Sequence, residues 1–458
     1  MENFRPISLL PTISKIMEKC VFNQVFSYFE NNKLLYDSQY GYRKEHSTET
    51  ACLEIIDKLN KQLDKKEIPL CIFIDLSKAF DTLDHRILLS KLKYYGMDDI
   101  SLYWFKSYLS NRHQFVEIEG YKSKLKQINT GVPQGSILGP LLFIIYMNDI
   151  NFVSNTFEAI IFADDTTLNS VLSLFSKHDK SNLSGIINKE INKLYDWMKA
   201  NKLSLNIKKT KYMVFRYPQK SRHSLPKLSI KINDVIIERV DQFKFLGIII
   251  HETLSWKFHT DMIRMKISKV VGVMRRLRNY ISTQVLLKIY NALILSHLHY
   301  GILCWGFTGP RLFKVQKKAI RVICKRKYNS HTDPLFKKLK LTKINDIFKT
   351  KCLTFLFNLK KGKVPAYFRN TFKFTGGEHN YNTRNRDRIQ PTRTNKKTTD
   401  KTLRQYIPVL TETIPNSIMN KIDTHSLQSL KRNTKLFFIE KYESQCNKPN
   451  CYICSNNR

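Results

Sequence analysis

The sequence predicts an α+β fold with more than one domain. In the first 250 residues, short apolar runs rich in strand formers alternate with apolar residues at helical spacing. After about residue 255 only long amphipathic helix patterns remain. A length of 458 residues with 42% hydrophobic side chains allows a sizeable core and two to four domains.

The charge balance points to a polyanionic partner. The chain has 77 Lys+Arg against 38 Asp+Glu, a net charge of +39, and basic residues occur in every third of it. Such an excess repels itself unless a polyanion neutralises it. A soluble basic protein and a membrane-surface binder stay open as alternatives, but the extent of the charge favours nucleic acid.

No membrane partner is expected. The longest apolar run, residues 137–147, is too short to span a bilayer and is interrupted by Gly139 and Pro140. No apolar signal segment opens the chain. The nine cysteines form no disulfide framework: six are scattered singly, and four of these six lie among apolar neighbours. Reduced thiols of this kind are typical of the nucleus or the cytoplasm, so we expect either or both locations.

The elements of the first third follow from periodicity. Helix patterns cover residues 14–29 and 47–63, with Ser47 or Thr48 as N-cap candidates for the second. Residues 70–76 form a short apolar run that predicts a buried strand, interrupted only by Asp75. A helix pattern fills residues 84–110, and alternation over 113–120 predicts a strand and a turn.

The second part of the α+β region is marked by loops and a carboxylate pair. Residues 130–135 form a glycine-proline loop that leads into 137–147, interpreted as a helix start broken at Pro140. Residues 159–168 are typical of a strand, an acidic turn and a second strand. A helix is predicted over 184–200, and a further strand hairpin around 211–249.

The C-terminal half is predicted to be helical and basic. Residues 257–280 combine an apolar face at helical spacing with several cations. More helices are expected through 365, then a basic linker at 375–404 and a last helix at 424–443. Near the end, Cys446, Cys451 and Cys454 supply three of the four ligands of a structural zinc site, so zinc binding stays open.

Three carboxylates suggest a metal-dependent site. Asp75 ends a predicted strand, and Asp164 and Asp165 lie at a hairpin turn between apolar residues. Phosphoryl transfer to a hydroxyl needs two hard cations about 3.5–4 Å apart, and Mg²⁺ takes only one or two protein carboxylates. Taken singly, each Asp could equally be a strand cap or turn former. Charges between apolar strands are costly, however, and a divalent ion would balance them.

The order of three motifs resembles reverse transcriptase. Phe-Ile-Asp-Leu-Ser-Lys-Ala-Phe-Asp occupies residues 73–81, Gly-Val-Pro-Gln-Gly-Ser 131–136, and Phe-Ala-Asp-Asp 162–165. Within that class the chain is similar to jockey-type non-LTR retrotransposon polymerases over roughly residues 3–310. The resemblance implies a right-hand polymerase, with an antiparallel palm sheet packed by helices. The implied divisions are fingers and palm at 1–250, a helical thumb at 251–310, a helical region at 311–374, the linker at 375–404 and a Cys-bearing tail at 405–458.

The resemblance also implies roles for individual residues. Asp75, Asp164 and Asp165 would bind two Mg²⁺ ions, with Mn²⁺ as an alternative metal. The implied nucleotide-binding residues are Phe80, which would reject a 2′-hydroxyl, Gln134, Arg43 and Lys209. Leu246 and Gly247 would form the primer grip. Each of these residues also has a purely structural interpretation. Phe80 could be a core residue and Gln134 part of a plain turn. Arg43 and Lys209 could be surface cations, and Leu246 with Gly247 could form a core hairpin.

The implied function is RNA-directed DNA synthesis, with an RNA template, a DNA primer and dNTPs as partners. A decayed or truncated copy that only binds RNA or DNA is the first alternative, and another palm polymerase the second. No nuclease constellation is apparent, and we expect a complete element to carry an endonuclease upstream. The sequence leaves the template preference and the oligomeric state open.

Overall fold

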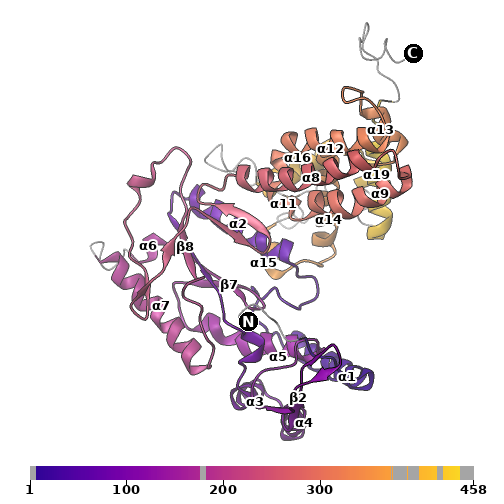
Figure 1. Ribbon diagram of the computed structural model, residues 1–458. Helices are drawn as coiled ribbons and strands as arrows, with labels where there is room; N and C mark the ends of the chain where they lie inside the picture. The colour runs from indigo at the N-terminus through magenta and orange to yellow at the C-terminus, as the bar shows by residue number, and fades with distance from the viewer. Residues whose placement is uncertain are drawn as a thin grey trace, which may run out of the picture. The chain divides into compact units, whose positions relative to one another are not determined.

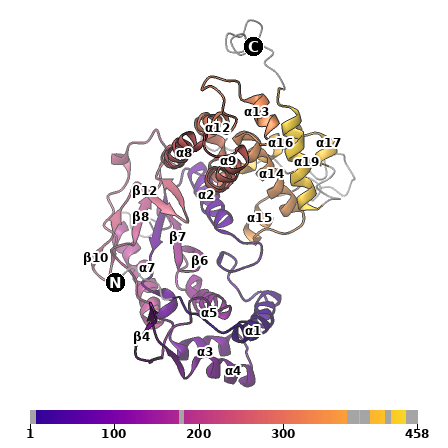
Figure 2. The ribbon, with the colours of Figure 1, turned by 45° about the vertical axis from the view of Figure 1, so that its right-hand side comes forward.

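The computed structural model describes residues 7–175, 182–372, 374, 389, 402–419 and 426–443. The chain divides into two compact units, shown in Figure 1 and Figure 2. Unit 1 comprises Met1–Ala51 and Lys65–Asp241, and unit 2 comprises Cys52–Asp64 and Gln242–Arg458. Helix α2 (Thr48–Asp64) contributes its first residues to unit 1 and the rest to unit 2. The predicted α+β class is confirmed, while the finer division into five segments stays a prediction.

Unit 1 is built on a five-stranded sheet in the order β11-β8-β1-β7-β6. Its strands are β1 (Pro69–Ile74), β6 (Glu158–Phe162), β7 (Asp165–Val171), β8 (Lys211–Val214) and β11 (Glu238–Arg239). All pairings are antiparallel except that of β11 with β8. β1 therefore lies at the centre of the sheet, and its carboxyl end lies beside the turn between β6 and β7.

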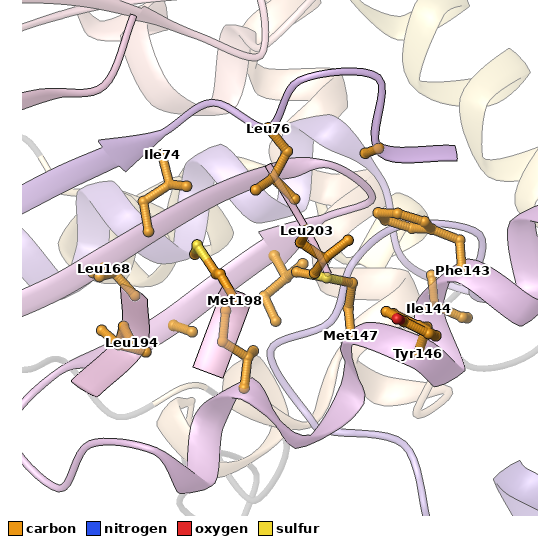
Figure 3. Close-up of a cluster of buried hydrophobic side chains, with 14 of the residues drawn as sticks. Ile74, Leu76, Phe143, Ile144, Tyr146, Met147, Leu168, Leu194, Met198 and Leu203 are labelled. Carbon is orange, nitrogen blue, oxygen red and sulfur yellow. The ribbon is translucent and has the colours of Figure 1, made fainter. Parts of the chain in front are cut away.

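The helices of unit 1 share one hydrophobic core with this sheet. They are α1 (Thr12–Asn31), α3 (His85–Tyr94), α4 (Asp99–Leu109), α5 (Leu138–Met147), α6 (Leu172–Phe175) and α7 (Leu183–Ala200), with 3₁₀ turns η1 (Ala79–Asp81), η2 (Asn148–Phe152) and η3 (Arg222–Ser224). Figure 3 shows side chains of β1, α5, β7 and α7 gathered in one cluster, among them Ile74, Phe143, Leu168 and Met198. Because side chains alternate along a strand, Ile72 and Ile74 enter this core while Phe73 faces away.

Short strands complete unit 1. They are β2 (Arg112–Gln114), β3 (Glu117–Ile118), β4 (Tyr121–Lys122), β5 (Lys126–Ile128), β9 (Lys231–Ile232) and β10 (Val235–Ile236). The pairs are β2 with β5, β3 with β4, and β9 with β10. The segment at 211–249, predicted as one hairpin, thus holds several short strands rather than two.

Two further predictions were wrong in detail. Residues 84–110 form two helices, α3 and α4, because Gly96 adopts a left-handed φ of 89° and Asp98 caps the second helix through Ser101 N–H. The helix α5 is not broken at Pro140. Proline is tolerated in the first turn of a helix, where its missing N–H would have no intrahelical acceptor, and Pro140 lies in that turn.

Unit 2 consists of one hairpin and a set of helices. The hairpin is β12 (Gln242–Phe245) with β13 (Ile248–His251). The helices are α8 (Lys257–Leu277), α9 (Thr283–Tyr290), the π-helical η4 (Asn291–Leu295), α10 (Ser296–His299), α11 (Ile302–Trp305), the 3₁₀ turn η5 (Gly306–Thr308), α12 (Pro310–Ile323), α13 (Asp333–Lys338), α14 (Ile344–Lys360), α15 (Ala366–Thr371), α16 (Leu403–Thr413), α17 (Asn416–Met419) and α19 (Leu427–Glu440). The predicted basic helix at 257–280 corresponds to α8, and the predicted last helix at 424–443 corresponds to α19.

The centre of unit 2 is α14, which buries ten side chains and contacts α19, α16, α11 and α12. Cys446, Cys451 and Cys454 lie outside the described residues, as does most of the predicted linker at 375–404. Within the part of the chain that the structure describes, no helix combines the length and the apolar character needed to cross a bilayer.

Candidate active site

The acidic turn is a two-residue hairpin connection. β6 ends at Phe162 and β7 begins at Asp165, so Ala163 and Asp164 form the turn. Ala163 has a left-handed φ of 57°, which costs a non-glycine residue about 1–2 kcal/mol. Gly41 supports the turn closely, because a Cβ at that position would lie 2.5 Å from Ala163 N. The turn is therefore held in a strained shape by the chain segment behind it.

The strand register brings Asp75 beside this turn. β1 and β7 pair up to Ile74 opposite Thr166, so the next pair along the two strands is Asp75 and Asp165. Adjacent strands lie about 4.8 Å apart, and opposed residues point to the same face. For Asp75 this is the face opposite the core side chains Ile72 and Ile74. The first and third of the predicted carboxylates are thus neighbours, and Asp164 is one residue away.

Lys209 lies on the other side of Asp75. Phe73 pairs with Lys211, the first residue of β8, and Lys209 lies in the turn just before that strand. The Lys209 Nζ is 3.9 Å from Asp75 Oδ2. The Asp75 backbone is fixed there, because its carbonyl accepts a 2.8 Å hydrogen bond from Asn206 N–H. Asp75 and Asp165 therefore form a carboxylate row at the ends of two adjacent strands, with the Lys209 ammonium beside Asp75.

The carboxylates fit divalent ions that are shared with a substrate. Asp165 is exposed, and the Asp75 side chain is 39% exposed, so solvent and ligands can reach both. Among the described residues, no three His, Cys, Asp or Glu side chains converge closely enough to hold a metal by themselves. Mg²⁺ is usually bound by one or two carboxylates together with substrate phosphates, so a ready-made cage is not required.

Phe80 is held as a rigid ring near this row. It lies in η1, after Lys78 in a left-handed conformation with φ of 50°. Its ring stacks on Phe143 at 4.5 Å between centroids, and the Tyr42 ring meets it edge-on at 6.4 Å. Phe143 is fully buried, so Phe80 cannot move back into the core.

The loop that carries Gln134 is attached to the same turn. Val132 N–H donates to Phe80 O at 2.9 Å, and Gln134 Nε2 donates to Asp81 Oδ1 at 2.9 Å. Gly131 is needed here, because its φ is 82° and a Cβ would lie 2.7 Å from Asp81 O. The structure therefore brings Phe80 and Gln134 together through Asp81.

Arg43 has a different environment from the one expected. Its side chain is 9% exposed and forms a 2.8 Å ion pair with Glu30, and its Nη1 donates to Tyr36 O. In this arrangement the guanidinium fixes the segment that follows α1 to that helix, and it is already engaged in an ion pair. A role on the triphosphate would require the Glu30 pair to open.

The predicted primer-grip residues belong to unit 2. Leu246 and Gly247 form the turn of the β12–β13 hairpin, with φ of 42° and 83°. Two positive φ values are typical of a tight type I′ turn. The Tyr300 hydroxyl donates to Leu246 O. A Cβ at position 247 would lie 3.2 Å from Cε1 of the Tyr300 ring.

Three residues of the site had no role in the sequence prediction. Tyr42 meets Phe80, Asp81 accepts from Gln134, and Tyr300 holds the hairpin turn. Asp81 lies inside the motif at residues 73–81, so a carboxylate directly after Phe80 was an available signal. Tyr300 carried no signal, because its contact partner lies 54 residues away.

The fold and the carboxylate row define a class of protein, and comparison with known families agrees with it. The profile of the reverse transcriptase (RNA-dependent DNA polymerase) family matches residues 1–250, more than half of the chain. The chain belongs to this family. This membership confirms the family predicted from the three motifs.

Particular relatives are polymerases of mobile elements. The chain is 28% identical over 360 residues to the RNA-directed DNA polymerase from mobile element jockey of Drosophila melanogaster, covering 76% of this chain and 38% of that protein. It is also 28% identical over 365 residues to a probable RNA-directed DNA polymerase from transposon BS of the same species, covering 75% and 39%. The predicted likeness to jockey-type polymerases is confirmed, and the chain spans about four-tenths of the length of these relatives.

A likeness to a solved structure is weak. Apo telomerase from Candida Tropicalis matches 71% of this chain and 53% of its own, with 13% identity and a TM-score of 0.39. Such a low score adds nothing to the assignment.

Proposed function

We propose that this chain is the polymerase part of a non-LTR retrotransposon reverse transcriptase, which extends a DNA primer with dNTPs on an RNA template. The observation that carries the proposal is the register that sets Asp75 beside Asp164 and Asp165 at the end of the central strands. The family match supports the reaction class. The basic charge of the chain supports a nucleic-acid substrate.

Asp75, Asp164 and Asp165 would hold two Mg²⁺ ions, or Mn²⁺, together with the phosphates of the incoming nucleotide. Such ions activate the primer 3′-hydroxyl and stabilise the leaving pyrophosphate. Lys209, whose Nζ lies 3.9 Å from Asp75 Oδ2, would donate a proton to that pyrophosphate. Phe80 would exclude ribonucleotides, Gln134 would contact the incoming nucleotide, and Leu246 with Gly247 would position the primer end.

Primer extension on poly(rA)–oligo(dT) with Mg²⁺ tests this proposal. We expect extension by the natural chain and a loss of at least about a thousandfold for Asp164→Asn, because a neutral amide cannot balance the metal charge. The matched control is Asp234→Asn, an exposed Asp in a turn remote in sequence, which should extend normally. Extension by Asp164→Asn at the natural rate would contradict the assignment of this residue.

The alternative function is template binding without chemistry, as in a decayed or truncated copy. Failure of both proteins to extend, with unchanged affinity for the template–primer, would support this alternative. Comparison of dNTP with rNTP incorporation separates a reverse transcriptase from another palm polymerase, because only the former should prefer dNTPs.

A further inference from the structure

A strongly basic hollow lies between two helices of unit 2. α8 and α12 pack side by side, as both ribbon views show (Figure 1, Figure 2). At their C-terminal ends they enclose a hollow of about 630 Å³. Seven of its ten lining residues are cations: Arg275, Arg278, Lys318, Arg321, Lys325, Arg326 and Lys327.

The hollow continues as a groove toward the N-terminal ends of the same helices. A second hollow is lined by Arg264, Arg311 and Lys314 and shares Lys318 with the first. Its one acid, Asp261, pairs with Arg264 at 3.2 Å. At 1.5 Å rise per residue, the stretch from Asp261 to Arg278 spans roughly 25 Å. The groove is therefore long enough for several phosphate groups.

The cations of the first hollow have no acidic partners within the described ranges, since none of the seven forms an ion pair there. Cations near a helix C-terminus stabilise the helix dipole, which explains one or two of them at the end of α12. Seven in one concavity repel one another, and this cost is not offset by any acid of the described chain. A bound polyanion would offset it.

The loop after α12 presents an aromatic ring among these cations. Tyr328 is 85% exposed, although it lines the hollow. The loop is ordered by the chain itself: Arg326 N–H donates to Arg321 O at 2.9 Å, and Arg321 Nε donates to Ser330 O at 2.8 Å. The backbone on both sides of Tyr328 is thus held in place, and the Tyr328 ring faces solvent beside the cations.

We propose that this hollow binds single-stranded nucleic acid, with the cations on the phosphates and Tyr328 stacked on a base. A duplex keeps its bases stacked inside and offers none to an aromatic side chain, whereas a single strand exposes them. Phosphates alone would need only the cations, so the exposed ring is the feature that favours a single strand. The hollow is lined by residues of unit 2 alone, whereas the carboxylate row belongs to unit 1, so binding to the hollow can be measured without polymerase activity.

Fluorescence anisotropy of the full chain tests the proposal. The probes are a labelled oligouridine, an oligothymidine of equal length and a duplex of that length. Tyr328→Ala should weaken binding of single strands about tenfold and binding of the duplex much less, and Tyr328→Phe should restore single-strand binding. If Tyr328→Ala weakens binding of the oligouridine more than binding of the oligothymidine, the bound strand is assigned as RNA. If it weakens both equally, the hollow recognises phosphates and bases and not the sugar.

The cations are tested by the salt dependence of binding. Lys325→Gln/Arg326→Gln/Lys327→Gln should reduce the slope of log K against log salt for single strands by about two. The matched control is Lys431→Gln/Arg432→Gln/Lys435→Gln on α19, which removes the same charge from exposed positions. The proposal is overturned if Tyr328→Ala binds single strands normally, if it weakens single strands and duplex equally, or if both triple variants reduce the slope alike.

Discussion

At the scale of single residues, Phe80 makes a testable claim about sugar selection. Its ring stacks on fully buried Phe143, so a clash with a 2′-hydroxyl cannot be relieved by retreat. We expect Phe80→Ala to raise the ratio of rNTP to dNTP incorporation by about tenfold or more. Phe80→Tyr, which keeps the ring, should keep the selection. Primer extension with each nucleotide set measures the ratio, and an unchanged ratio for Phe80→Ala would return Phe80 to a packing role.

Glu18 is a buried carboxylate that holds the start of α5. It is 2% exposed and accepts from Ile137 N–H at 2.6 Å and from the Tyr108 hydroxyl at 3.0 Å. A carboxylate at a helix N-terminus balances the helix dipole and the unpaired N–H groups. Glu18→Gln should lower the free energy of unfolding by about 1–3 kcal/mol. Urea denaturation measures it, with exposed Glu45→Gln as control; equal values for both variants would contradict the capping role.

The residues that chemistry singles out were predictable, and their neighbours were not. Asp75, Asp164 and Asp165 stand out in the sequence because they are charged residues directly beside apolar strand patterns, although the structure leaves Asp75 and Asp165 open to solvent. The Glu30 partner of Arg43 lies 13 residues earlier, and no local pattern pairs the two. A cation in a motif can be assigned to a ligand or to a structural ion pair only when its surroundings are known.

At the scale of elements, the β12–β13 hairpin depends on a buried histidine. His259 on α8 accepts from Ile249 N–H through Nδ1 at 3.3 Å and lies against the Trp305 ring. Burial lowers the pKa of His259 from 6.5 to about 4, and the positive charge of Lys266 contributes further. The imidazole is therefore neutral in the folded protein at physiological pH.

This histidine predicts a loss of stability in mild acid. Above pH 6.5 the ring is neutral in both the folded and the unfolded chain. Between pH 6.5 and about 4 only the unfolded chain takes up the proton, so folding weakens as the pH falls through this window. Between pH 7.5 and 5 the loss should be about 2 kcal/mol. Urea denaturation at both pH values checks this; His259→Gln should remove that part of the loss, and exposed His113→Gln should not.

Most of the helices and strands were predicted from the sequence, and the errors in their boundaries have local causes. The antiparallel strands around the acidic turn and the long helix α8 follow from strong periodicity. Gly96 was overlooked because apolar residues on both sides of it continue the same helical spacing. Pro140 was overestimated as a breaker because its effect depends on where the first turn begins. The strands between 211 and 249 are too short for alternation to resolve.

At the scale of the whole molecule, one ionic cluster joins sequence-distant parts of unit 2. Asp57 on α2 accepts from Arg404 of α16 and from the Tyr367 hydroxyl of α15, and Lys61 lies 3.5 Å from Asp57. Burial raises the pKa of Asp57, and the Arg404 charge opposes this rise. The carboxylate thus depends on its partners to stay charged.

Removing one partner of the Asp57 carboxylate should therefore lower the free energy of unfolding. Arg404→Met should lower the free energy of unfolding by about 3 kcal/mol, and adding Asp57→Asn should recover part of the loss because the unpaired charge is gone. Denaturation of the single and double variants measures this coupling, with exposed Arg369→Met as control. A double variant that is as unstable as the sum of both single variants would show that the cluster is not a cooperative unit.

The path of α2 through both units has a consequence for synthesis. Residues 52–64 belong to unit 2, yet the remainder of that unit begins only at Gln242. Their buried side chains, Ile55 and Leu59 among them, leave the ribosome before any other part of unit 2 exists. At about 5–20 residues per second, this apolar segment waits on the order of 10–40 seconds for its partners. Nascent chains should therefore need a chaperone or early protection over this segment, and unit 1 cannot be released as an uninterrupted stretch of polypeptide.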